Sequence, residues 1–242
     1  MPAFALQRNP SIGELVTSLT SSGVATGAAE TASRGRVLCL HGFKTSSTVL
    51  RQQMAPLARA LEGHGYALIV PDGPHVTSGD AQGAAGLDAD DSYGWWTYED
   101  DSHDSTPIGL HASTKLLHRL GPSFVGVVGF SQGGAMAAAV ADSVGARWAL
   151  LFSPVYVPQR PAQCSCPTLV AFDPADEVRE ATKTLLDELP SATLQTLTHA
   201  DGHRLPPDGA WWESVAAFVK DQVVRGDSAA PSSGAAASDH GV

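Results

Sequence analysis

The stretch from Phe124 to Ala139 constrains the fold of this chain more than any other. It begins with the apolar run FVGVVGF, passes through a Gly129-x-Ser131-x-Gly133 pattern, and ends in the alanine-rich run AMAAA. A strand, a sharp turn and a helix in that order are typical of a nucleophile elbow, which presents a serine hydroxyl above the end of a sheet. Glycine suits the two flanking positions because a side chain there would collide with the adjoining strand or helix. The sequence therefore predicts that Ser131 is a nucleophile.

Apolar runs alternate with helical patterns over most of the chain. The runs are continuously apolar, which is typical of strands buried on both faces of a parallel sheet. Strands separated by helices predict an α/β fold with a mostly parallel central sheet and helices on both faces. The expected strands are 36–40, 66–70, 124–130, 148–152, 168–172 and 192–198, and the expected helices are 50–61, 108–120, 179–189 and 210–224.

Three parts of the chain differ in composition. Residues 1–34 are rich in small and polar residues and predict an N-terminal extension with a short amphipathic helix. Residues 35–225 form the expected domain, within which the acidic, aromatic segment 72–106 predicts a lid-like loop insertion. Residues 226–242 have the Gly, Ala, Ser and Asp content of a disordered tail.

The charge and the cysteines exclude several classes of function. A net charge of −10 argues against a nucleic-acid or anionic-membrane partner, and no apolar run is long enough for a membrane span. Three cysteines make no disulfide framework and favour a reducing, cytoplasmic location, with organelle targeting by the extension left open. The acidic residues lack calcium-site spacing and Cys164-x-Cys166 lacks zinc spacing, so neither a metal nor a cofactor is expected.

A nucleophilic serine needs a base, and the base needs a third group that holds its tautomer. In a parallel sheet these groups lie at the carboxyl ends of strands, which share one edge. The expected strand 168–172 is followed by Asp173 and Asp176, and the strand 192–198 is followed by His199 and His203. Serine, aspartate and histidine in that chain order are typical of an α/β-hydrolase.

Several short motifs together resemble the FSH family of serine hydrolases. They occur in the family's order over roughly residues 36–224, and the resemblance implies an α/β-hydrolase in which Ser131 is the nucleophile, His203 the base and Asp176 the orienting acid. The family pattern has glycine where this chain has Asp173, so Asp173 could compete with Asp176 for the acid role. The motifs are His41-Gly42-Phe43, Asp72-Gly73-Pro74-His75, Gly94-Trp95-Trp96, Gly129-Phe130-Ser131-Gln132-Gly133 and Gly202-His203-x-x-Pro206.

Two backbone amides are expected to form an oxyanion hole. One is the amide of Gln132, which follows the nucleophile, and the other is that of Phe43, or of Lys44, in the loop after the first strand. His41 is expected to brace that loop, and His199 to brace the loop that carries the base.

The aromatic residues of the 72–106 segment predict a substrate pocket. Tyr93, Trp95 and Trp96 are expected to form its wall for an acyl chain, and core packing of the two tryptophans is the alternative. The predicted function is hydrolysis of a carboxylic ester or thioester of a small acyl substrate through an acyl-enzyme. A serine peptidase with the same triad, or a hydrolase-like binding protein without turnover, remains an alternative.

Overall fold

The structure is a computed structural model that describes residues 34–77, 92–98, 106–207 and 209–229, all within one compact unit. The described elements, in chain order, are β1 (Gly35–Leu40), α2 (Ser47–Gln53), α3 (Ala55–Gly63), β2 (Tyr66–Ile69), β3 (His75–Val76), β4 (Tyr93–Gly94), β5 (Thr97–Tyr98), β6 (Pro107–Ile108), α4 (Leu110–Arg119), β7 (Phe124–Phe130), α5 (Gln132–Val140), β8 (Ala149–Phe152), β9 (Thr168–Phe172), α6 (Arg179–Glu188), a 3₁₀ turn (Ser191–Thr193), β10 (Leu194–Thr198) and α7 (Gly209–Ala229).

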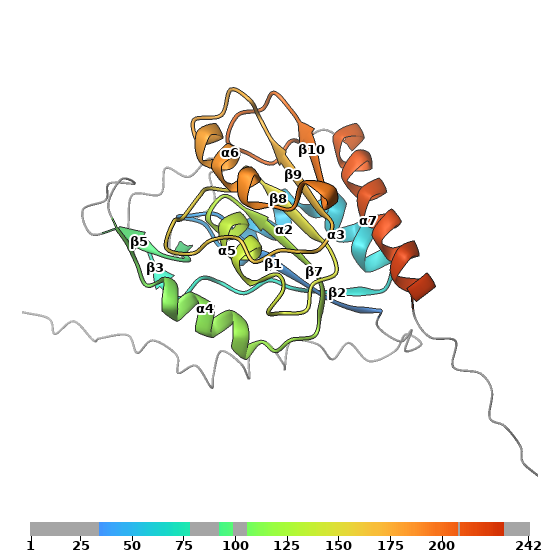
Figure 1. Cartoon of the computed structure of the whole chain (residues 1–242), viewed down its shortest axis with the longest axis horizontal. Helices are drawn as coiled ribbons and strands as arrows, with labels where there is room; N and C mark the ends of the chain where they lie inside the picture. The colour runs from blue at the N-terminus through green and yellow to red at the C-terminus, as the bar shows by residue number, and fades with distance from the viewer. Residues whose placement is uncertain (1–33, 78–91, 99–105, 208, 230–242) are drawn as a thin grey trace, which may run out of the picture. The chain divides into compact units, whose positions relative to one another are not determined.

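Six strands form the central sheet, in the order β10-β9-β8-β7-β1-β2 (Figure 1). Every pairing between neighbours in this sheet is parallel. The carboxyl ends of β7, β8, β9 and β10 therefore lie along one edge, so the loops that follow these strands are neighbours. This arrangement confirms the predicted fold class.

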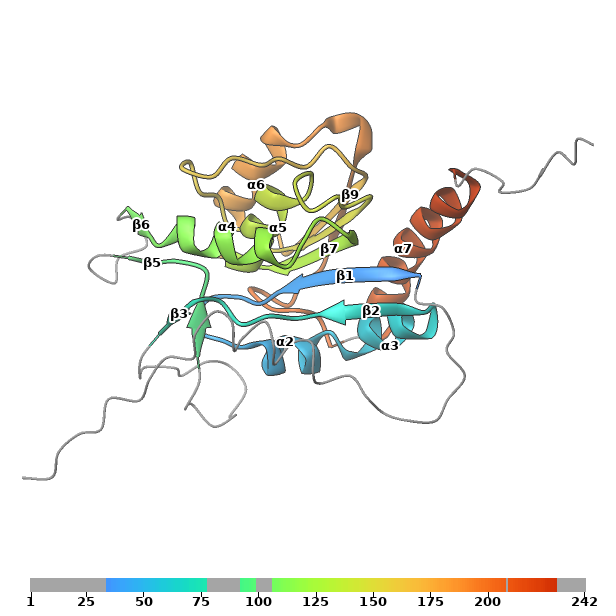
Figure 2. The same cartoon turned by 90° about the horizontal axis from the view of Figure 1, so that it is seen from below.

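Helices cover both faces of the sheet (Figure 2). Side chains of β1 alternate between the two faces: Val37 and Cys39 belong to the core beneath α2, α3 and α7, whereas Leu38 and Leu40 belong to the core beneath α4, α5 and α6. A strand whose successive side chains point to opposite faces must be apolar throughout when both faces are covered. The continuous apolar runs of the sequence have this cause.

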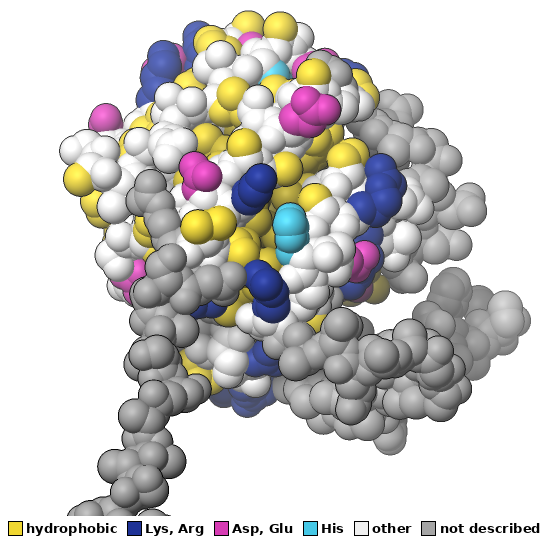
Figure 3. All heavy atoms as spheres, turned by 90° about the vertical axis from the view of Figure 1, so that its right-hand side faces the viewer, with side chains coloured by type: hydrophobic (Ala, Val, Ile, Leu, Met, Phe, Trp, Pro, Cys, Tyr) yellow, Lys and Arg dark blue, Asp and Glu magenta, His cyan; other side chains and the backbone are white. Residues whose placement is uncertain are grey.

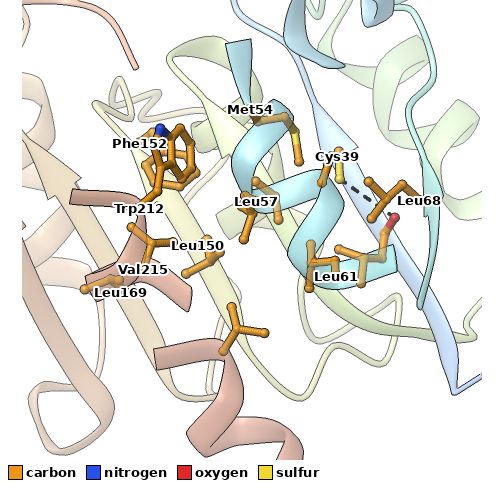
Figure 4. Close-up of a cluster of buried hydrophobic side chains, with 14 of the residues drawn as sticks. Cys39, Met54, Leu57, Leu61, Leu68, Leu150, Phe152, Leu169, Trp212 and Val215 are labelled. Carbon is orange, nitrogen blue, oxygen red and sulfur yellow. Dashed lines mark hydrogen bonds between the residues drawn. The ribbon is translucent and has the colours of Figure 1, made fainter. Parts of the chain in front are cut away.

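Figure 4 shows side chains of the core beneath α2, α3 and α7. Met54, Leu57 and Leu61 pack against Cys39 and the strands at helical spacing, and each is at most 1% exposed. Helix α2 ends at Gln53 and α3 begins at Ala55, with Pro56 in the first turn of α3, where its missing amide hydrogen costs no hydrogen bond. The expected helix 50–61 is therefore two helices, and Pro56 lies where the second one begins.

The segment predicted as a lid-like loop contains short strands where it is described. Strand β3 pairs with β4 and β5 pairs with β6, both antiparallel, in two small sheets beside the main one. Residues 78–91 and 99–105 lie outside the described residues. Residues 72–77 and 92–98 of the segment thus contain short strands where their composition indicates a loop.

The terminal predictions are only partly covered by the structure. The N-terminal extension lies outside the described residues, apart from Arg34. Helix α7 continues to Ala229, past Gly226, where the sequence predicts the start of a disordered tail. Within the described part of the chain, no helix combines the length and apolar character that crossing a membrane requires. Acidic and basic side chains are interspersed on the face shown in Figure 3.

Candidate active site

Ser131 occupies the turn between β7 and α5, as the sequence predicts. Its backbone has φ 55° and ψ −117°, a conformation that non-glycine residues seldom adopt. A Cβ at Gly129 would collide with the carbonyl oxygen of Gly133, and a Cβ at Gly133 would collide with that of Leu40. Only glycine at both positions lets the helix start this close to the strands, and the Ser131 backbone turns sharply as a result.

The structure brings Ser131, His203 and Asp176 into one chain of hydrogen bonds. The Oγ of Ser131 lies 3.0 Å from Nε2 of His203, and Nδ1 of His203 lies 2.8 Å from Oδ2 of Asp176. A carboxylate only accepts hydrogen bonds, so Nδ1 carries the ring proton and Nε2 is left to accept from the serine hydroxyl. The Asp176 side chain has no exposed surface, whereas that of His203 is 24% exposed. The imidazole therefore faces solvent on one side and is held by a buried acid on the other.

Of the two acids after β9, Asp176 is the one that contacts the imidazole. Its second oxygen, Oδ1, accepts the backbone amide of Val178 at 3.0 Å, which orients the carboxylate. Asp173 instead accepts two backbone amides, those of Ala175 and Gly202, each at 2.7 Å. These two hydrogen bonds stabilise the charged form and so hold the pKa of the Asp173 carboxyl below its usual value. The bond from Ala175 has the larger effect and that from Gly202 the smaller one.

His199 lies in the loop after β10 but braces that loop, as the sequence predicts. Its Nδ1 accepts the backbone amide of Asp201 at 3.3 Å, and its ring meets the indole of Trp211 edge-on. Burial lowers the pKa of His199, because the charged imidazolium loses hydration there. The neutral ring is the form that can accept the Asp201 amide.

The loop after β1 lies directly against the nucleophile. A Cβ at Gly42 would be 2.9 Å from the ring of Phe130 and 3.5 Å from Cβ of Ser131, so the loop passes close above the elbow. Phe43 follows Gly42 in this loop, and Gln132 is the first residue of α5, where backbone amides have no acceptor within the helix. Of the two residues predicted for an oxyanion hole, Gln132 directly follows Ser131, and Phe43 directly follows the Gly42 that lies against it.

His41 braces this loop from inside the protein. Its Nε2 accepts the backbone amide of Gly73 at 2.9 Å, so Nδ1 carries the proton and donates to the carbonyl of Gly42 at 2.7 Å. The residue is fully buried, and this burial lowers the pKa of its imidazole. The predicted bracing role is confirmed.

Trp95 and Trp96 do not line a pocket, and this part of the sequence prediction is wrong. Both side chains are 0% exposed and belong to the core beneath α4, α5 and α6. The indole Nε1 of Trp95 also donates to the carbonyl of His41 at 2.8 Å. A side chain without exposed surface offers no contact to a substrate. Tyr93 is half-buried, and its backbone exchanges hydrogen bonds with Thr45.

The side chain of Gln132 makes two hydrogen bonds that the sequence does not reveal. Its Oε1 accepts the amide of Trp95 at 3.0 Å, and its Nε2 donates to the carbonyl of Trp96 at 3.2 Å. These partners lie in the 93–96 segment, which the chain reaches long before the elbow, so no local pattern could predict the contact. The residue after the nucleophile thus ties that segment to the start of α5.

Among the described residues, no group of three or more histidine, cysteine, aspartate or glutamate side chains is arranged to hold a metal ion. Cys164 and Cys166 lie in the core, with their sulfur atoms 3.6 Å apart.

Comparison with known proteins gives consistent matches over this domain. A family model described as serine hydrolase (FSH1) matches residues 31–215. Esterase OVCA2 of Homo sapiens is 32% identical over 209 residues, which cover 71% of this chain and 89% of the relative. Esterase FUS5 of Gibberella moniliformis is 26% identical over 205 residues, which cover 77% of this chain and 86% of the relative.

Solved structures match the fold at lower identity. A Bacillus cereus carboxylesterase superposes with a TM-score of 0.57 at 17% identity, over 77% of this chain and 88% of its own. A hydrolase of the alpha/beta superfamily from Xanthomonas campestris superposes with a TM-score of 0.52 at 21% identity, over 79% of this chain and 99% of its own. These likenesses show the α/β-hydrolase fold.

Proposed function

The chain belongs to the serine hydrolase (FSH1) family, and we propose that it cleaves carboxylic esters or thioesters through an acyl-enzyme formed on Ser131. In this proposal His203 is the general base and Asp176 the acid that orients it. The backbone amides of Gln132 and Phe43 form the oxyanion hole. The esterase names of the similar proteins, OVCA2 and FUS5, support an ester as the substrate class.

The observation that carries the proposal is the unbroken hydrogen-bonded chain from Ser131 through His203 to Asp176. The two distances, 3.0 Å and 2.8 Å, are those expected for a nucleophile on its base and a base on its orienting group. A binding protein without turnover would have no need for this arrangement together with a strained backbone at the serine.

Acylation follows from the tautomer of His203. Because Nδ1–H is bound to Asp176, Nε2 takes the Ser131 proton as Oγ attacks the substrate carbonyl. The resulting imidazolium lies against the buried carboxylate, which stabilises its charge. The same proton then passes to the leaving alkoxide or thiolate, and the acyl group remains on Oγ. Water deprotonated by His203 releases the acid in a second, equivalent step.

Charge on the carbonyl oxygen develops between the two predicted amides. The amide of Gln132 belongs to the N-terminus of α5, where the aligned peptide dipoles also favour negative charge. Loss of one such donor typically lowers kcat by about 10²–10³. The bracing of the Gly42–Phe43 loop by His41 supports a preorganised position for the second amide.

Matched substrates distinguish this proposal from its rivals. We expect measurable turnover on an ester and a thioester of one acyl group, and turnover on the corresponding anilide that is lower by orders of magnitude. Ser131→Ala should lower ester turnover by roughly 10⁶ while the circular dichroism spectrum stays unchanged. Comparable rates on the anilide would favour a peptidase, and no turnover on any of the three would favour a binding protein.

A further inference from the structure

Asp173 is a buried carboxylate that lies next to the proposed triad but is not one of its three members. It is 6% exposed, and each of its oxygens accepts one backbone amide. Oδ1 binds the amide of Ala175 and Oδ2 binds the amide of Gly202, both at 2.7 Å. Hydrogen bonds to an ionised acceptor are shorter and stronger than those to a neutral acceptor, so this carboxylate holds both amides firmly.

The two amides belong to the two loops that present the triad. Ala175 directly precedes Asp176 in the loop after β9, and Gly202 directly precedes His203 in the loop after β10. Asp173 therefore joins the acid loop to the base loop one residue before each reacting side chain. Its own carbonyl also accepts the amide of Asp176 at 3.0 Å.

We propose that Asp173 is a positioning residue that sets the separation between Asp176 and His203, an inference that rests on the proposed function. The acid side of this pair is held independently, because Val178 donates its amide to Asp176. On the base side, Asp173 holds the amide of Gly202, the residue directly before His203. Gly202 has φ 70°, a conformation open to glycine, and beyond the triad and the ring of Phe130 this loop is held by the bond from Nε1 of Trp212 to the carbonyl of Pro206.

This role also explains why two acids follow β9 within four residues: Asp176 contacts the imidazole, and Asp173 holds the backbone that carries the imidazole.

Two substitutions at Asp173 test the proposal, each measured on the full chain with a p-nitrophenyl ester. Asp173→Ala removes both acceptors, and we expect kcat to fall about 100-fold, because a misplacement of about 1 Å costs that much. Asp173→Asn keeps one acceptor and turns an NH₂ group toward the other amide, so we expect a fall of about tenfold. KM should stay within about twofold in both variants, since neither loses a substrate contact.

A spectroscopic measurement separates positioning from mere stabilisation. The proton on Nδ1 of His203 should give a low-field NMR signal in the wild type, and this signal should broaden or disappear in Asp173→Ala at a temperature where the variant is folded. Asp142→Ala is the matched control: Asp142 accepts the backbone amide of Ser165 at 2.9 Å, beyond the far end of α5. It should change the melting temperature without changing kcat or the signal.

The outcomes either support the proposal or overturn it. A kcat within twofold of the wild type for Asp173→Ala, with an unchanged signal, overturns it. A loss for Asp173→Asn as large as that for Asp176→Asn also overturns it, because Asp173 would then be the acid. Failure of the proposed function itself would give a different result: the wild-type chain would show no ester turnover, whatever the Asp173 variants do.

Discussion

Replacing Gln132 by methionine tests whether its side chain holds the tryptophan segment to the elbow. Methionine has a similar length and volume, but it neither accepts the Trp95 amide nor donates to the Trp96 carbonyl. Gln132 is 3% exposed and both tryptophans are fully buried, so water cannot readily replace the two lost bonds. Each backbone group left unpaired costs about 1–3 kcal/mol. The free energy of unfolding should therefore fall by about 2–6 kcal/mol.

Urea unfolding followed by tryptophan fluorescence measures this change. The control is Gln163→Met, an exposed glutamine whose substitution should alter the free energy of unfolding by about 0.5 kcal/mol or less. The backbone amide of residue 132, proposed for the oxyanion hole, is retained in Gln132→Met, so the protein that remains folded should still react at Ser131. An effect no larger than that of the control would refute the inference that the side chain ties the two segments together.

Three further predictions concern the core, the buried histidine and the acid. Trp95→Ala and Trp96→Ala should each lower the free energy of unfolding by about 3–5 kcal/mol and leave the acyl-chain preference unchanged; a shift in preference across an ester series would restore the pocket hypothesis. Burial lowers the pKa of His41 in the folded state, so the unfolded chain binds more protons below about pH 6.5, and stability should decrease as the pH falls through this region. His41→Asn should reduce that pH dependence in urea unfolding, whereas an unchanged dependence would contradict the role given to the ring. Asp176→Asn should lower kcat by about 10⁴ with an intact fold, and a loss of tenfold or less would remove Asp176 as the orienting acid.

The sequence predicts well what local pattern and strand order determine. The elbow at Ser131 needs a strand, two glycines and a helix, and all of these are contiguous in the chain. The placement of Asp176 and His203 at one edge follows from parallel strands, whose carboxyl ends must coincide. Strand boundaries move by only one or two residues, as at Trp148, which precedes β8 instead of starting it.

Contacts between distant segments are less predictable. The sequence does not distinguish a pocket wall from core packing for Trp95 and Trp96, because an aromatic side chain suits either place. Only the tertiary structure decides between them. Asp173 and Asp176 both follow β9 within four residues, so spacing alone does not indicate which one turns toward His203. The amide partners of Gln132 and Asp173 lie on other loops, and backbone amides leave no signature in the sequence.

Covalent capture by a fluorophosphonate probe tests the proposed nucleophile most directly. Such a probe reacts with a serine whose hydroxyl is activated by a base, and peptide mass spectrometry then locates the adduct. The geometry at Ser131 predicts one adduct per chain on that residue, slowed in Asp176→Asn and absent in Ser131→Ala. An adduct on another residue, or ester turnover that persists in Ser131→Ala, would contradict the assignment of Ser131 as the nucleophile.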